Sequence, residues 1–488
     1  MVGLKSTTFL FLEKRFDMRI KLSRALILIL SLVVFQSGLI FGQKEKDTSQ
    51  ETLIYLRVEL STTSDWTILR WENFGQIKTM RVFAVDGKNP EFNVFYNQIK
   101  LTQKLERENQ SSKIIVDYLI KSNKDEKWRY SLLRGAVGES KSKIQIKKDF
   151  EFEEIYSFNH SKQNPSDLNE NKITNEISFK FDPKYSFKPE PAITAQIPKL
   201  VLAFYYLWYT KDNWKIYPLK DEPLNFYSSS DEKTIERQIK LAKANGIDGF
   251  ITSWDGPNTY SDQNFKKFLK LANRFKFKTT IYYETLTDKG PRDDEEIISH
   301  LRYLIQTYTK EKSFIKIFDK PLIVIWASNE ISINRWRQII TRLRSENLDA
   351  TFIGMGYDIS NLEVFDGVHQ YGVILMDDLQ KEYQQISEIV KNYHLIGKKQ
   401  KIWTATAQPG YDERTITGRK GFFKERKSGK YFEETFNAAI KSNPDLIFIT
   451  SFNEWWEHTY IEPSKKNGNL YLNLTKKFSK LWKTKSSK

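Results

Sequence analysis

The order of apolar and polar residues divides the chain into two differently patterned parts. Between residues 50 and 183, short runs alternate apolar and polar positions with a period of two, the pattern of strands that are buried on one face. Clusters of Asn, Asp, Gly and Lys separate these runs, as in antiparallel strands joined by turns. We therefore predict an antiparallel β-sandwich accessory domain over residues 50–183. Its strands are expected at 53–60, 66–71, 78–85, 113–120, 127–133 and 176–181, with a polar loop at 160–172.

The second part begins after a proline-rich stretch. Residues 184–198 carry Pro189, Pro191 and Pro198 and predict a linker, because proline stiffens the chain without pairing it. From residue 199 to residue 488, near-continuous apolar runs alternate with amphipathic helical patterns. One helical stripe runs from Phe265 to Phe275, and another from Ile297 to Tyr308 behind the acidic residues 293–296. The apolar runs are 200–209, 247–254, 278–284, 322–327, 351–357, 365–372, 401–407 and 445–452.

Apolar strands that alternate with helices indicate a parallel sheet covered by helices, and eight repeats over this length favour a closed barrel. We predict an α/β fold in which a (β/α)8 TIM barrel is preceded by the antiparallel β-sandwich-like domain. An open doubly wound sheet is the alternative. The open sheet is disfavoured because no glycine-rich phosphate loop follows the first strand, and the residues at the end of that strand are aromatic.

The N-terminus has the order of residues found in a secretory signal. The basic stretch 18–24 precedes the uncharged apolar core 25–35, which is shorter than a membrane-spanning helix requires. We predict that residues 1–42 are a signal peptide or N-terminal anchor and that the protein is exported, to the periplasm or outside the cell. A membrane is an expected partner only if the signal stays uncleaved, with residues 25–41 as the anchor.

Composition narrows the chemistry. The sequence has no Cys, which excludes disulfides, thiol nucleophiles and Cys-ligated metals. The net charge of +16 does not by itself predict a nucleic-acid partner, because basic residues are interleaved with acidic ones, as at 121–129 and 419–430, which we interpret as solvated surface. No cofactor and no metal site are expected, since the five His show no ligand spacing. They are His160, His300, His369, His394 and His458.

The ends of the predicted barrel strands are rich in aromatic, carboxylate and amide side chains. A barrel builds its active site from these ends. Sugars present C–H faces that stack on Trp and Tyr and hydroxyls that bond to polar side chains, so this composition suits an oligosaccharide or polysaccharide cleft. Any single Trp could instead be packing. The strand-end residues are Tyr205, Tyr206, Trp208, Trp254, Asp255, Glu284, Trp326, Tyr357, Gln370, Tyr371, Gln408, Tyr411 and residues 453–457.

Glu454 and Glu457 are the sharpest candidate pair. Residues three apart point to opposite faces of an extended strand, so both carboxylates can face one substrate only if the chain coils directly after Phe452. In a helical turn the same spacing places two side chains about 5–6 Å apart. Two neighbouring acids should then titrate separately, which leaves one as an acid and one as a base. An exposed acidic turn is the alternative interpretation.

A long motif contains this pair. The stretch ITSFNEWWEHTYIEPS (449–464) resembles the signature ITSFNEWHEGTQIEP of glycoside hydrolase family 99, the endo-α-mannosidases and endo-α-mannanases, or a related family 71/99-like protein. Weaker resemblances follow in the family's order: FYYLWY (204–209) is similar to YYPWY, TSWDGP (252–257) to SWWGP, IYYET (281–285) to HIEPY and QPGYDER (408–414) to PGYDD. The resemblance covers residues 199–485 and leaves the β-rich part unexplained.

The resemblance implies a retaining glycoside hydrolase. Glu454 would be the base that deprotonates the substrate 2-hydroxyl, and Glu457 the general acid that later activates water. The sequence departs from the family motif at two positions next to the glutamates, where Trp456 and His458 replace the family's His and Gly. His458 is either a sugar contact or a packing residue. The substrate-binding candidates are Tyr205, Tyr206, Trp208, Trp254, Glu284, Trp326, Tyr411, Asn453, Trp456 and His458.

Two other functions stay open at this point. A non-catalytic glycan-binding surface protein would use the same aromatic residues but would have no use for the glutamate pair. A metal-dependent hydrolase would need ligand spacing that the His residues do not show.

Overall fold

The computed structural model describes residues 52–484 except 74, 85–90, 96, 103–110, 136–137, 162–171 and 193. The predicted signal or anchor, residues 1–42, and most of the predicted polar loop at 160–172 lie outside this part of the chain. None of the helices in the described part has the length and apolar character needed to cross a membrane.

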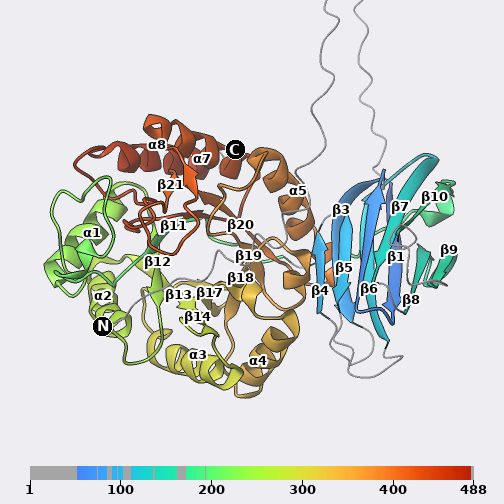
Figure 1. The fold of residues 1–488 in the computed structure, drawn as a ribbon, viewed down its shortest axis with the longest axis horizontal. Helices are drawn as coiled ribbons and strands as arrows, with labels where there is room; N and C mark the ends of the chain where they lie inside the picture. The colour runs from blue at the N-terminus through green and yellow to red at the C-terminus, as the bar shows by residue number, and fades with distance from the viewer. Residues whose placement is uncertain are drawn as a thin grey trace, which may run out of the picture.

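Two antiparallel sheets form the N-terminal sandwich (Figure 1). One has the strand order β3-β6-β1-β8-β9 and the other β10-β7-β2-β5-β4. Alternate residues of β1, such as Leu56 and Val58, are fully buried between the sheets, as the period-two pattern predicts. The strands are β1 (Leu53–Thr62), β2 (Trp66–Glu72), β3 (Gln76–Ala84), β4 (Glu91–Phe95), β5 (Gln98–Thr102), β6 (Ser112–Lys121), β7 (Glu126–Arg134), β8 (Glu139–Lys148), β9 (Glu151–Ser161) and β10 (Lys172–Phe179).

The six predicted sandwich strands are present, but β4, β5, β8 and β9 were not expected. β8 and β9 lie at one edge of their sheet and are rich in charged and polar residues. An edge strand with a solvated face needs few apolar side chains, so its composition resembles that of a loop. β4 and β5 are short, with five residues each, which leaves little room for an alternating pattern.

The C-terminal part is a closed parallel barrel, which confirms the predicted fold class. Pairing runs β13-β12-β11-β23-β20-β19-β18-β17, and a further pairing between β13 and β17 closes the ring and excludes the open sheet. Figure 1 shows the strands inside a ring of helices. The barrel strands are β11 (Leu200–Tyr205), β12 (Gly249–Trp254), β13 (Lys278–Glu284), β17 (Lys320–Trp326), β18 (Thr351–Met355), β19 (Gly367–His369), β20 (Ile402–Ala407) and β23 (Leu446–Ile449).

Helices cover the outside of this barrel. The stripe from Phe265 to Ala272 is buried on α2 and the stripe from Ile297 to Tyr308 on α3, as predicted. Asp293 caps α3 by accepting the amide of Glu296, so the acidic stretch does lie at a helix N-terminus. The helices are α1 (Glu232–Ala244), α2 (Tyr260–Phe275), α3 (Asp294–Tyr308), α4 (Ile333–Ser345), α5 (Leu379–Lys391), α6 (His394–Gly397), α7 (Lys430–Lys441) and α8 (Leu470–Thr484).

Alternate residues of each barrel strand pack in two different cores. Leu202 and Phe204 of β11 belong to the cluster that fills the barrel lumen, whereas Val201 and Ala203 belong to the cluster between the strands and the helices. The parity of a residue along its strand therefore decides whether its side chain can reach a site at the barrel mouth.

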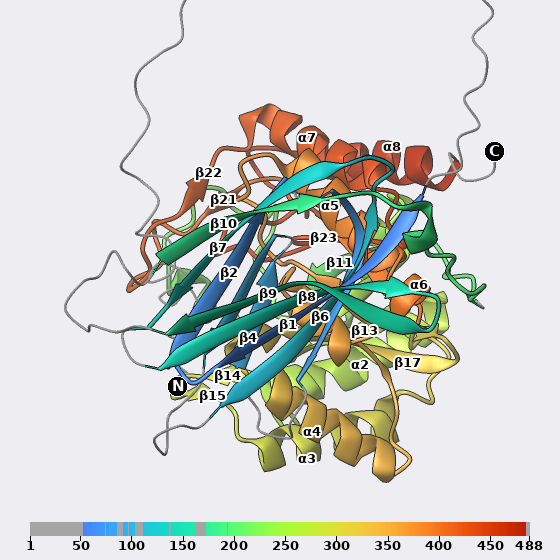
Figure 2. The ribbon, with the colours of Figure 1, turned by 90° about the vertical axis from the view of Figure 1, so that its right-hand side faces the viewer.

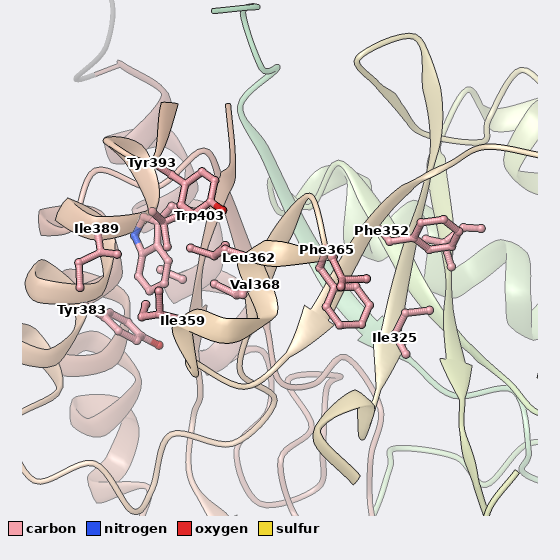
Figure 3. Close-up of a cluster of buried hydrophobic side chains, with 14 of the residues drawn as sticks. Ile325, Phe352, Ile359, Leu362, Phe365, Val368, Tyr383, Ile389, Tyr393 and Trp403 are labelled. Carbon is pink, nitrogen blue, oxygen red and sulfur yellow. The ribbon is translucent and has the colours of Figure 1, made fainter. Parts of the chain in front are cut away.

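The sandwich docks where the ring of helices is thin. The described chain between β18 and β19 contains only the 3-10 helix η6 (Ile359–Glu363), and Figure 3 shows Ile359 and Leu362 of η6 beside Val368 and Trp403 of the barrel. Asp358 accepts hydrogen bonds from Asn93 Nδ2 at 2.7 Å and from the Val94 amide at 3.0 Å, both on β4. Figure 2 shows both sheets in front of the barrel.

The predicted linker is partly paired. The Phe187 amide donates to the Leu53 carbonyl at 2.6 Å, so the start of the segment lies along β1. The described residues from 187 to 199 form no helix or strand.

Replacing Asp358 with Ala should weaken the contact between the two parts. The change leaves Asn93 Nδ2 and the Val94 amide without their acceptor and also removes the cap that Asp358 gives Ser360 of η6, so we expect the free energy of unfolding to fall by about 1–3 kcal/mol in urea titrations. Asp288→Ala, at an exposed turn, is the control and should change it by less than about 0.5 kcal/mol. Equal effects of the two changes would contradict a role for Asp358 in docking.

Candidate active site

The chain turns sharply after β23, at the C-terminal mouth of the barrel. The Glu454 amide donates to Ser451 Oγ at 2.8 Å. Glu454 Oε1 accepts the amides of Trp456 at 2.9 Å and Glu457 at 3.3 Å, so the carboxylate folds residues 454–457 back on themselves. The coil that the spacing of the two glutamates required is therefore present.

Glu454 lies deep in the site. The residue is 3% exposed, and its second carboxyl oxygen, Oε2, has no hydrogen-bond partner among the described residues. Burial, and then the charge of Glu457, raise the pKa of Glu454 well above its ordinary value. A buried oxygen without a partner costs free energy, so a ligand hydroxyl that donates to Oε2 would be stabilised there.

Glu457 is held from two sides. Its Oε2 accepts the hydroxyl of Tyr371 at 3.2 Å, and Tyr371 in turn accepts the hydroxyl of Tyr206 at 2.9 Å. Its Oε1 accepts Arg419 Nη1 at 2.6 Å. These contacts leave the side chain partly exposed, at 13%, whereas Glu454 is enclosed. The two carboxyl groups thus share a turn but have different surroundings.

Arg419 brings a third carboxylate, that of Glu413, to the site. Its Nη1 also lies 3.1 Å from Oε2 of Glu413, whose side chain is fully buried. Tyr411 donates its hydroxyl to the same oxygen at 2.7 Å, so this predicted substrate-binding residue is engaged with the protein. The interpretation of residues 419–430 as solvated surface is wrong for Arg419, whose side chain is 12% exposed. A fully buried carboxylate requires a counter-charge, which sequence periodicity does not reveal.

A further pair of carboxyl groups lies at the ends of β12 and β13. Ser253 donates to Glu284 Oε1 at 2.6 Å, and Arg292 donates to the backbone carbonyls of Glu284 at 3.0 Å and Asp255 at 2.9 Å. Burial, and then the charge of Asp255, raise the pKa of Glu284 to about 8. Burial also raises the pKa of Asp255. Glu284 therefore lies at the barrel mouth beside Asp255, which was not among the predicted substrate-binding residues.

Aromatic rings form a wall beside the glutamates. Trp208 and Trp456 stack with ring centroids 5.7 Å apart, and Tyr206 lies 4.3 Å from Trp208. The Nε1 atoms of both tryptophans have no hydrogen-bond partner within the described part of the chain. Trp326 packs against the same lumen cluster and is partly buried. Tyr206, Trp208 and Trp456 are thus brought together beside the glutamate turn, and a wall of this kind can receive the C–H face of a sugar.

Tyr205 and Trp254 are not brought to the site. Tyr205 donates to Gln238 Oε1 at 2.6 Å and stacks on Phe250, and Trp254 donates to Asp262 Oδ1 at 3.0 Å. Both belong to the cluster between strands and helices. The prediction of substrate contacts for these two residues did not take account of which strand positions face the lumen. The adjacent residues, Tyr206 and Asp255, are at the positions that face it.

Asn453 and His458 are occupied by contacts within the protein. Asn453 Oδ1 accepts the Tyr206 amide at 2.8 Å, and its Nδ2 donates to the Tyr206 carbonyl at 2.9 Å. His458 Nε2 accepts the Lys220 amide at 2.9 Å, which leaves Nδ1 as the donor to the Asp412 carbonyl at 3.0 Å. Burial lowers the pKa of His458. Asn453 ties the glutamate turn to the end of β11, and His458 ties it to the β20 loop, the segment 408–429 between β20 and α7.

Sequence reasoning missed Tyr371, Asp255, Glu413 and Arg419. Tyr371 and Asp255 stood among the strand-end residues, and parity counted from the lumen residues of their strands would have selected them. Glu413 stood within the segment 408–414 that resembles the family's PGYDD but was not selected, and nothing in the local pattern marks Arg419. Within the described residues, no group of three or more His, Cys, Asp or Glu side chains is arranged to hold a metal ion.

The sequence of the barrel part is similar to one family of known proteins. The sequence model of glycosyl hydrolase family 99 matches residues 213–484, which is more than half of the chain. The rat glycoprotein endo-alpha-1,2-mannosidase is 27% identical over 294 residues, 52% of this chain and 62% of that protein. The human glycoprotein endo-alpha-1,2-mannosidase-like protein is 27% identical over 271 residues, 50% of this chain and 58% of that protein.

Similarity to a solved structure concerns the barrel. The GH99 endo-alpha-mannosidase from Bacteroides thetaiotaomicron superposes with a TM-score of 0.52 at 22% identity, over 58% of this chain and 97% of that one. At this identity the likeness shows a shared fold. This chain spans less than two thirds of the length of the curated relatives, and the family match leaves the sandwich unaccounted for.

Replacing Asn453 with Ala should destabilise the protein. The change leaves the buried amide and carbonyl of Tyr206 without these partners, so we expect the free energy of unfolding to fall by about 1–3 kcal/mol in urea titrations. Asn329→Ala, at an exposed position, is the control. Unchanged stability together with weaker saccharide binding would show that Asn453 serves the substrate instead.

Proposed function

Because the chain belongs to glycosyl hydrolase family 99, we propose that its barrel is a glycoside hydrolase that cleaves a mannose-containing glycan with retention of configuration. One observation supports this proposal most directly. Glu454 and Glu457 share one turn at the barrel mouth, and Glu454 keeps a buried oxygen with no partner in the described chain. A protein that only binds glycans can gain its affinity from aromatic rings that stack on the sugar. It would have no use for a buried carboxyl oxygen beside a second carboxylate.

The first step uses both glutamates at once. Glu454 Oε2 takes the proton of the substrate 2-hydroxyl, and that oxygen attacks the anomeric carbon to form a 1,2-anhydro sugar. Glu457 gives its proton to the glycosidic oxygen as the bond to the leaving sugar breaks. No carboxylate is bonded to the sugar, which distinguishes this route from the usual retaining mechanism, in which a carboxylate is the nucleophile.

The second step returns both protons. Glu457, now a carboxylate, takes a proton from water as the water oxygen attacks the anomeric carbon. The epoxide oxygen recovers its proton from Glu454, and the 2-hydroxyl is restored. Inversion at the anomeric carbon occurs in each step, so the product has the configuration of the substrate.

The surrounding residues have roles that follow from their placement. Trp208, Trp456 and Trp326 supply faces for sugar rings. Glu284, held by Ser253, accepts or donates to a sugar hydroxyl. Tyr371 orients Glu457. Asn453 and His458 fix the turn and are not assigned a substrate contact.

The cleaved bond and the location of the protein are also proposals. The rat relative is an endo-alpha-1,2-mannosidase, and the human relative is an endo-alpha-1,2-mannosidase-like protein. An α-mannoside inside a longer chain is therefore the first substrate to try. The N-terminal pattern supports export, with an uncleaved anchor as the alternative. The sandwich would bind the same glycan or only pack on the barrel.

Glu454→Gln and Glu457→Gln should each abolish most glycan cleavage. Loss of a positioned acid or base costs about 100-fold or more in rate, so oligosaccharide release from mannans and bacterial envelope glycans should fall by at least that factor. The exposed Glu425→Gln, on the β20 loop, is the matched control and should keep the parent's rate.

Three outcomes separate the possibilities. Equal release by the parent and both glutamate variants would remove the catalytic assignment. Binding without release by the parent on every glycan tried would favour the non-catalytic glycan-binding protein. Loss of release with unchanged glycan binding in the variants is the result that the proposal expects.

A further inference from the structure

Arg419 reaches from the β20 loop into the site. It lies between β21 (Tyr411–Asp412) and β22 (Phe423–Lys424), which pair with one another. Gly418 and Gly421 flank it with φ values of 83° and 82°, so glycine backbone conformations frame its position. Its Nη1 lies 2.6 Å from Glu457 Oε1, a charge-assisted contact shorter than its 3.1 Å approach to Glu413.

The charges that face Glu457 come from several elements, and Arg419 is the cation that contacts it. Its turn contributes Glu454, and the neighbouring strands and loops contribute acidic or phenolic groups. A guanidinium in contact with a carboxylate stabilises its ionised form. The facing groups are Tyr206 directly after β11, Tyr282 and Glu284 from β13, Tyr371 after β19, and Tyr411 and Arg419 from the β20 loop, where Glu413 bonds to the same guanidinium.

Glu454 lacks such a contact. Its Oε1 accepts two backbone amides, its Oε2 accepts nothing from the described residues, and Arg419 bonds to Glu457 instead. Burial and the charge of Glu457 raise the pKa of Glu454. When the pair holds a single proton, that proton therefore resides on Glu454.

We propose that Arg419 is a positioning residue that holds Glu457 as a carboxylate in the free protein, while Glu454 carries the proton of the pair. The first step needs the opposite arrangement, with Glu454 as the carboxylate and Glu457 as the acid. The catalytic consequence of this inference rests on the proposed function, whereas the protonation states themselves are a property of the free protein. Only one proton separates the two arrangements: it leaves the Glu454 carboxyl group and joins the Glu457 carboxylate, with no change of total charge.

The contact has a use in the second step. Once Glu457 has given its proton to the leaving sugar it must remain a carboxylate to activate water, and the guanidinium stabilises that form. Arg419 thus opposes the first step and supports the second. Glu413 keeps a partner for Arg419 throughout, because it is buried and bonded to the same Nη1.

Carboxyl-carbon NMR of protein labelled with ¹³C at the glutamate δ-carbon tests the free protein directly, without any substrate. Signals are assigned by their loss in Glu457→Gln and Glu454→Gln. In the parent, Glu457 should change to its ionised chemical shift at lower pH than Glu454. In Arg419→Gln, which removes the cation, we expect the Glu457 transition to move up by about one pH unit or more.

Matched variants separate charge from folding. Arg419→Lys keeps a positive charge and should leave the transition near its parent position. Arg414→Gln removes a loop arginine that bonds Asp412 and neither glutamate, and should move nothing. The double variant Glu413→Gln with Arg419→Gln leaves no buried charge unpaired, so it keeps the test valid if Arg419→Gln alone unfolds.

The acid limb of the pH–rate profile should follow the same shift wherever the parent cleaves a glycan. A Glu457 transition that stays within 0.2 pH unit in both the single and the double variant would overturn the inference, and so would a parent in which Glu454 ionises first. Absence of cleavage by the parent, with the NMR shifts as expected, would count against the proposed function alone.

Discussion

The candidate site depends on a single carboxylate accepting the backbone of its own turn. Glu454 Oε1 takes the amides of Trp456 and Glu457, and this brings together two acids that an extended strand would separate. The same contact leaves Oε2 buried and free for a ligand among the described residues. Asn453 anchors the turn to Tyr206, the residue directly after β11, so the ends of the first and last barrel strands hold the acids jointly.

Enclosing several carboxyl groups at one barrel mouth has an electrostatic cost that the structure meets unevenly. Glu413 and Glu457 share the guanidinium of Arg419, whereas Glu284 is buried beside Asp255 and its pKa rises to about 8. Arg292 donates to backbone carbonyls near that pair and to the side chain of Glu296, and it makes no hydrogen bond to either carboxyl group of the pair among the described residues. The cation of Arg419 therefore offsets carboxylate charge at the glutamate turn, whereas burial beside Asp255 lets Glu284 hold a proton at neutral pH.

The sequence predicted the barrel well because its strands are apolar on both faces and its helices carry long stripes. It predicted the sandwich less well, since β8 and β9 are of polar composition and β9 is an edge strand. In the site, the motif located Glu454 and Glu457. Tyr205 and Trp254 were wrongly included because alternate residues at a strand end face the lumen and the helices in turn, and these two face the helices. Arg419 could not be inferred locally, because its burial results from contact with residues far along the chain.

The central claim is that the glutamate pair works through the substrate's own 2-hydroxyl. The most direct test compares cleavage of an α-mannan oligosaccharide with cleavage of its analogue that lacks the 2-hydroxyl on the sugar at the cleaved bond. We expect the parent protein to release product from the first and none from the analogue, although both bind. Release from the analogue at a comparable rate would show that the oxygen is not the nucleophile and would contradict the roles given to Glu454 and Glu457.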